Sequence, residues 1–164
     1  MQVIDIFRDI LLSFFVAVGF ALLFETPKKA IWIAGLLGGL GHGLRFVMLQ
    51  LDFGLVSATL CGTVFIGIAG IYCAHKINTP PVVFTLPACI TMIPGLYAYR
   101  TMLGCIRIYE MGTSMKNGEL LQDTAYNFIL TSSLLFCLAI GICIATLLFR
   151  KKSVKEIRWL KNQR

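Results

Sequence analysis

Residues 30–51 form an apolar stretch that carries two side chains able to do chemistry inside a bilayer. The stretch reads AIWIAGLLGGLGHGLRFVMLQL and places His42 and Arg45 about one helical turn apart. A run of this length predicts a transmembrane helix. Histidine can carry a proton near neutral pH, and arginine can hold a carboxylate. Ionisable residues at this depth therefore predict a functional site.

The glycines around this pair predict which face of the helix meets protein. In helical projection, one arc of roughly 200° contains Gly35, Gly39, Gly43, His42 and Arg45. The opposite arc is aliphatic and contains Leu36, Leu37, Leu40, Leu44, Val47 and Leu51. Small residues spaced by four let helix backbones approach closely. We expect the glycine arc to face protein and the aliphatic arc to face lipid.

Each residue of the pair also has a purely structural interpretation. His42 would then be a packing histidine bonded to a backbone carbonyl of the next helix. Arg45 would extend past Gln50 to the interface as an anchor. The position of both residues among glycines favours a cavity and a role in a transport pathway.

Composition places the chain in a membrane. It is 57% hydrophobic and only 14% charged, with a mean hydropathy of +0.80. The net charge is +7, but seven of the fifteen Lys and Arg residues follow Phe149. A basic tail fits an anionic lipid surface, so we expect a lipid bilayer and no nucleic acid as partner.

No arrangement of residues indicates an enzyme. The serines lack a His/Asp context, the carboxylates are unpaired, and there is no phosphate-binding loop. The six cysteines form no CxxC pair and lie in or beside apolar segments, as small hydrophobes do. We expect no catalytic residue, metal or cofactor.

The chain as a whole predicts an all-α integral membrane protein with about five transmembrane helices. Their expected ranges are 7–24, 30–51, 53–73, 82–103 and 126–149, within a single domain over residues 1–150. Residues 151–164 alternate basic and apolar residues and predict a basic cytoplasmic tail with a short interfacial helix. The first, third and fifth segments each carry a stripe of small or polar residues, which predicts inward-facing surfaces. These stripes are Ser13, Ala17 and Ala21; Thr59, Gly62, Thr63, Gly70 and Ala74; and Thr124, Asn127, Thr131, Gly141 and Ala145.

The fourth segment is expected to be a broken helix. Pro87 and the pair Pro94-Gly95 each remove or loosen a helical hydrogen bond. Free N–H groups after Pro94 would aim a positive helix end at a substrate carboxylate, as discontinuous transporter helices do. Tyr97 and Arg100 follow at helical spacing and extend the candidate site, whereas a simple kink is the structural alternative. For Asn127, hydrogen bonding between helices is the alternative to a binding role.

The distribution of basic residues predicts the orientation. Five spans place the termini on opposite sides, and a cytoplasmic C-terminus puts ten Lys and Arg residues inside against four outside. The positive-inside rule therefore predicts an N-terminus outside and a C-terminus in the cytoplasm.

Four motifs together resemble a known family. They are GFALLFETP (19–27), GLLGGLGHGLR (35–45), MIPGLYAYR (92–100) and NFILTSS (127–133). Their order and spacing resemble the small, YjjB-like subunit of the split threonine/serine exporters. Some relatives have Asn before the first proline, where this chain has Glu25 two places before Pro27. The resemblance implies a bacterial inner-membrane protein that works with a larger membrane partner and exports threonine and serine, or succinate.

The sequence thus favours one half of a carrier for small carboxylate-bearing metabolites, driven by an ion gradient. His42 is the candidate proton-linked group, and Arg45, Arg100 and Pro94-Gly95 are candidate carboxylate binders. Two alternatives remain: an accessory subunit without a substrate site of its own, and a small homo-oligomeric channel lined by glycine-rich helices.

Overall fold

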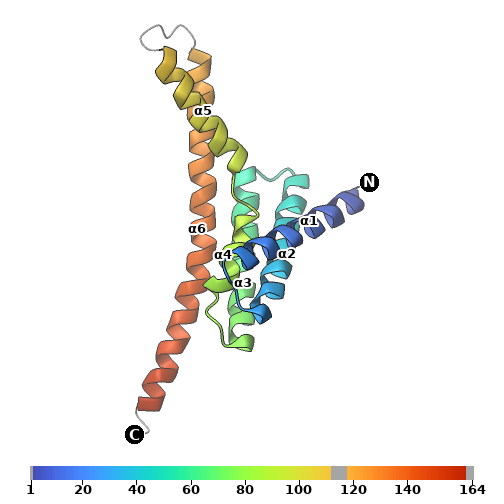
Figure 1. The fold of residues 1–164 in the computed structure, drawn as a ribbon, viewed down its shortest axis with the longest axis vertical. Coiled ribbons are helices and arrows are strands. Elements are labelled where there is room, and N and C mark those ends of the chain that lie inside the picture. Colours follow the sequence, from blue (N-terminus) through green and yellow to red (C-terminus); the bar gives the residue numbers. More distant parts are fainter. Residues whose placement is uncertain (1, 112–117, 162–164) are drawn as a thin grey trace.

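The protein is built from helices, as the composition predicted. The computed structural model describes the backbone of residues 2–111 and 118–161, and the side chains of residues 4–110, 118–144, 146 and 147. The described backbone forms α1 (Gln2–Leu23), α2 (Lys28–Gln50), α3 (Leu55–Ile77), α4 (Val82–Ile90), α5 (Gly95–Met111) and α6 (Gly118–Lys161), without a strand (Figure 1). The all-α prediction is confirmed.

The expected number of spans is also confirmed. Four helices, α1, α2, α3 and α6, are long and apolar enough to cross a membrane, and α4 with α5 makes a fifth span if the bent pair is counted as one. The axes of α4 and α5 differ by 63°. The two helices are separated by residues 91–94, which we call the break.

Only one of the two proline positions interrupts the helix. Pro94 ends the break, as expected, but Pro87 lies inside α4 and the prediction of a break there is wrong. A proline has no N–H to give to the carbonyl four residues earlier, here that of Val83. The Thr26 hydroxyl, from the loop between α1 and α2, donates to that oxygen at 3.3 Å. A neighbouring side chain therefore satisfies the carbonyl that Pro87 leaves free.

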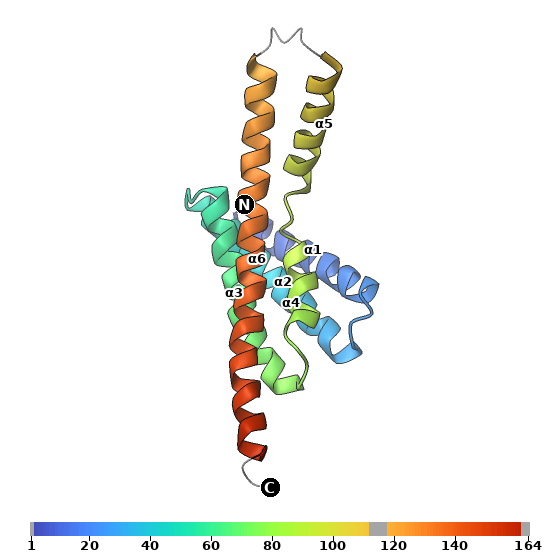
Figure 2. The same cartoon turned by 90° about the vertical axis from the view of Figure 1, so that its left-hand side faces the viewer.

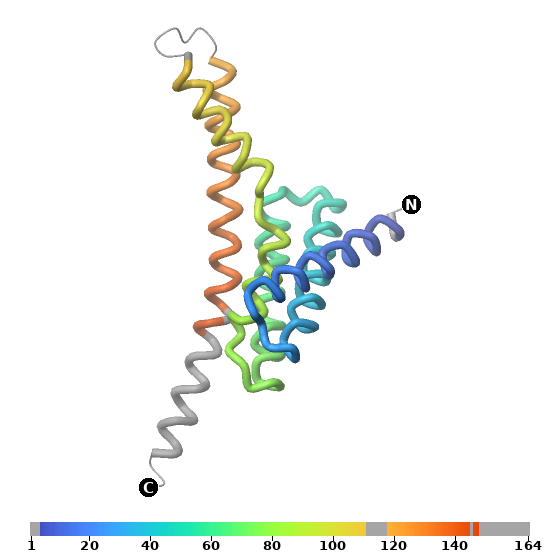
Figure 3. Tube along the Cα trace, in the orientation of Figure 1, coloured from blue at the N-terminus to red at the C-terminus, as the bar shows by residue number. Residues whose placement is uncertain are grey.

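The glycine arc of α2 packs against α1. A Cβ at Gly39 would stand 2.9 Å from the backbone oxygen of Ile10, and one at Gly35 would stand 2.7 Å from the Phe14 ring. At Gly43 an added Cβ would collide with the Ile10 side chain. The small-residue spacing thus brings α1 obliquely across α2, as the trace in Figure 3 shows.

The opposite arc of α2 is less uniform than expected. Leu36 and Leu40 are exposed, as lipid-facing residues should be, but Leu37 is buried in the core. The reason is that α2 has protein on more than one side, because it packs against α1, α3 and α4. Its neighbour Gly38 faces the backbone of Ala88 in α4 as well as Ala17 in α1.

The predicted stripe of α3 is buried against its neighbours. Its members Thr59, Gly62, Thr63, Gly70 and Ala74 are all buried. Thr63 donates its hydroxyl hydrogen to the carbonyl of Cys137 in α6 at 3.1 Å. A Cβ at Gly141 would stand 2.6 Å from the Thr63 carbonyl oxygen, so α3 and α6 approach at the closest distance that glycine permits.

Helix α6 is longer than the fifth predicted segment at both ends. It has 44 residues, or about 66 Å, which is roughly twice the thickness of a hydrocarbon core. It starts at Gly118, eight residues before the expected start, and its backbone continues through the tail to Lys161. The tail is therefore helical, but it continues α6 instead of forming a separate helix. The side chains of the tail and of Ala145 lie outside the described residues.

Helix α5 packs beside the start of α6 and against no other described helix. Figures 1 and 2 both show this α5–α6 hairpin extending beyond the other four helices.

Candidate functional site

The break between α4 and α5 lies against the centre of the α2–α3 hairpin. Met92 is fully buried, and its methyl group would be 3.0 Å from a Cβ at Gly62 and 3.2 Å from one at Gly41. This contact places the break next to the turn of α2 that carries His42 and Arg45.

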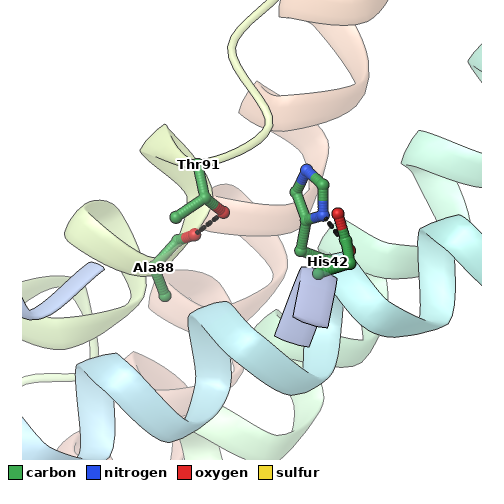
Figure 4. A network of polar contacts seen from close by, with 4 residues as sticks. His42, Ala88 and Thr91 are labelled. Carbon is green, nitrogen blue, oxygen red and sulfur yellow. Dashed lines mark hydrogen bonds and ion pairs between the residues drawn. The ribbon is translucent and has the colours of Figure 1, made fainter. Parts of the chain in front are cut away.

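His42 forms an ion pair with Asp9 of α1. Its Nδ1 lies 2.7 Å from Oδ2 of Asp9, and the side chains are 22% and 24% exposed. Figure 4 shows this contact at the labelled His42 ring; Thr91 of the break, in the same view, donates its hydroxyl to the Ala88 carbonyl at 2.8 Å. A bond of 2.7 Å between ionisable groups is a charge-assisted hydrogen bond. His42 is therefore paired with a carboxylate, and not with a backbone carbonyl as the packing interpretation required.

Asp9 reaches His42 because of how α1 crosses α2. The contacts of Ile10 with Gly39 and Gly43 bring the preceding turn of α1 over the His42 turn. Asp9 also continues the small-residue stripe of α1, one turn before the buried Ser13. Sequence reasoning missed Asp9 as a site residue, although this spacing of four was the signal that would have identified it.

Arg45 lies beside the pair without joining it. Its Nε is buried and has no hydrogen-bond partner among the described residues. The ionisable groups that act electrostatically on its guanidinium are Asp9 and, from the start of α5, Tyr97. A buried guanidinium N–H without an acceptor is costly, so this position favours an incoming anion.

A polar groove continues from Tyr97 along the α5–α6 hairpin. Its volume is about 410 Å³, and it is lined by Tyr97, Arg100, Leu103, Gly104, Arg107, Leu120, Asp123, Thr124, Tyr126 and Asn127. The helices approach closely where Gly104 meets the Thr124 side chain. Two arginines and one aspartate face this groove, so its walls carry a net positive charge.

The structure therefore brings the predicted site residues together in two groups. His42 bonds to Asp9 across α1 and α2 with Arg45 nearby, whereas Arg100 and Asn127 line the groove. Tyr97 lines the groove and lies near Arg45, so it stands between the two groups. The Asn127 amide donates to the Asp123 carbonyl of its own helix at 2.7 Å, and this bond does not join two helices.

Pro94 and Gly95 form the start of α5. Pro94 is buried and Gly95 is exposed. The Gly95 N–H donates to the Ile93 carbonyl at 2.9 Å, and the Ala98 N–H closes the first turn onto Pro94 at 3.0 Å. Of the N–H groups in this first turn, that of Gly95 thus already has an acceptor, and the Ala98 bond is the first regular bond of the helix.

The side chains of this site have two chemical capacities. Asp9 and His42 can share a proton, and Arg45 can bind a carboxylate bidentately. Within the described residues, no group of three His, Cys, Asp or Glu side chains is placed to hold a metal ion.

Comparison with known proteins identifies a family. No solved structure matches the chain. A protein of Haemophilus influenzae, named only as an uncharacterized protein, is 37% identical over 147 residues, which are 89% of this chain and 48% of the relative. The chain thus spans about half the length of this curated relative. The profile of the family described as threonine/serine exporter, ThrE, matches residues 9–148. The chain, a helical membrane protein, belongs to the ThrE family of threonine/serine exporters.

Proposed function

We propose that the chain is a subunit of an inner-membrane exporter for small carboxylate-bearing metabolites, either threonine and serine or a dicarboxylate such as succinate. The observation that carries this proposal is the buried Nε of Arg45, which has no acceptor among the described residues. Membership of an exporter family supports transport as the class of function, and a buried guanidinium N–H without an acceptor favours a carboxylate as substrate.

The substrate path runs from the Asp9–His42–Arg45 cluster to the α5–α6 groove. Tyr97 contributes to both places, and Arg100 lies one turn further along α5. A series of positive groups along a path gives an anion several weak binding sites, so no single site binds it too tightly for release. His42 is the proton-linked group because its partner is a carboxylate and its ring is partly accessible.

A larger membrane subunit completes the transporter. The Haemophilus influenzae relative is about twice as long as its matched region, so a related protein carries further chain beside an equivalent unit. Two five-helix halves with an odd number of spans each would enter the membrane in opposite senses, as the repeats of many carriers do. The N-terminus of this chain lies outside and its C-terminal tail in the cytoplasm, in accordance with the charge count.

Flux through reconstituted vesicles tests this function. Vesicles with this chain alone, the larger subunit alone, or both are loaded with threonine, serine or succinate, and release is followed. We expect release only with both subunits, and its loss in Arg45→Ala. Release through the larger subunit alone would indicate the accessory role, and release through this chain alone would indicate the channel.

A further inference from the structure

The Asp9 carboxylate has two basic neighbours and is bonded to only one of them. It contacts His42 at 2.7 Å, whereas it acts on Arg45 through space and forms no ion pair with it within 4.0 Å among the described residues. Ionic bonds of a carboxylate to histidine and to arginine are both favourable. Asp9 therefore has two possible basic partners, and the structure shows it bonded to His42.

We propose that Asp9 exchanges between His42 and Arg45 and thereby couples one proton to the binding of a carboxylate at Arg45. This inference rests on the proposed function and adds its coupling mechanism. While a proton is held between Asp9 and His42, Asp9 stays bonded to His42, and Arg45 is free to bind an external anion. When that proton is lost, Asp9 is a full negative charge beside neutral His42 and turns to Arg45, which closes the anion site.

The charge of the cluster gives the sign of the coupling. With the proton present, Asp9, His42 and Arg45 together carry one positive charge; without it they carry none. Charged groups in a partly buried site interact strongly, so an anion binds the protonated cluster better. Linkage is reciprocal, and anion binding must therefore raise proton uptake.

Few other ionisable groups interfere with this exchange. Helix α4, which packs against both α1 and α2, contains Cys89 as its one ionisable side chain. In α3, Cys61 neighbours the Gly62 contact but is exposed. The Arg8–Asp5 pair of α1 is at the exposed surface, and Tyr97 adds a phenol near Arg45. Helices α5 and α6 do not pack against α1 or α2.

Substitution of Asp9 and substitution of His42 should change carboxylate affinity in opposite directions. Asp9→Asn removes the internal competitor of Arg45, so carboxylate affinity should be higher than in the wild type. His42→Gln leaves Asp9 permanently charged and available to Arg45, so affinity should be low at every pH. A pair that only held α1 on α2 would lose function in both variants. Asp5→Asn, one turn earlier on α1 and exposed, is the matched control.

The test is calorimetric titration of the purified protein, with any subunit that copurifies, using succinate from pH 5.5 to 8.5. Two buffers of different ionisation enthalpy report the protons taken up. We expect uptake of about one proton per succinate in the wild type and in Asp5→Asn, with succinate affinity falling as the pH rises. Uptake should be absent in His42→Gln, which has no imidazole to accept the proton.

Succinate binding without proton uptake, proton release on binding, or a lower affinity in Asp9→Asn would overturn the exchange. If Asp9→Asn does not purify as a monodisperse protein, the number of protons that the wild type takes up per succinate decides whether the exchange holds. Wild-type vesicles that release neither threonine nor succinate would overturn the proposed function itself, whereas release without proton linkage would overturn only the coupling.

Discussion

The Thr26 hydroxyl donates a hydrogen bond of 3.3 Å to the Val83 carbonyl, which Pro87 leaves without a helical donor. This bond joins the loop before α2 to the first turn of α4. Thr26 is buried, with 6% exposure, so water does not readily replace its hydroxyl. The contact explains how a proline is accommodated within α4 while the chain breaks only at residues 91–94.

Replacing Thr26 by valine should destabilise the protein by about 1 kcal/mol, because the shape is kept and the Val83 carbonyl loses its donor. Thr26→Ser keeps the hydroxyl and should retain most of the stability. Thermal unfolding in detergent, followed by circular dichroism, measures both variants. Equal melting temperatures for Thr26→Val and the wild type would show that the bond does not stabilise α4.

Gly39→Ala should separate α1 from α2. The added methyl group would lie 2.9 Å from a backbone oxygen, which cannot rotate away. We expect a loss of about 1–3 kcal/mol, as for other overpacked sites. Gly19→Ala is the control, since a Cβ there meets nothing within 4 Å. Cross-linking between cysteines placed in α1 and α2 would report the separation, and unchanged efficiency in Gly39→Ala would contradict it.

Arg45→Lys should retain assembly but lose substrate affinity by tenfold or more. The planar guanidinium binds a carboxylate through two parallel bonds, which a lysine ammonium cannot make. Concentration-dependent export of threonine, serine and succinate at matched membrane expression measures the effect. Wild-type export of every substrate by this variant would mean that Arg45 is an anchor and that the site lies at Arg100.

Cysteine labelling tests the predicted orientation. A reagent that cannot cross the membrane should modify a cysteine introduced at Lys116 in intact cells and should not modify one at Lys155, because the charge distribution places the tail in the cytoplasm. Both positions should react after the membrane is permeabilised. The reverse pattern in intact cells would mean that the protein has the opposite orientation.

The α5–α6 groove should contribute to substrate capture. Arg100→Gln removes one of its positive groups at an exposed position, so assembly should persist while the apparent KM for export rises several-fold. Arg8→Gln, an exposed arginine of α1, is the control for a general loss of charge. An unchanged KM in Arg100→Gln would restrict the site to the Asp9–His42–Arg45 cluster.

The sequence by itself determined the class of the protein and most of its spans. Apolar length and helical periodicity are local properties, so they identified the five segments and the glycine arc of α2. They also identified His42 and Arg45, because ionisable residues stand out in an apolar segment.

The tertiary structure decided what these residues contact. Local sequence shows that Pro87 lacks a donor, but it does not show that Thr26, 57 residues away from Val83, supplies one. The partner of His42 is Asp9, 33 residues earlier, and only the crossing of α1 over the glycines of α2 brings them to 2.7 Å. Leu37 is buried for a similar reason, since α2 has neighbours on several sides. Side-chain periodicity defines the faces of one helix, whereas the packing of several helices determines which groups meet across them.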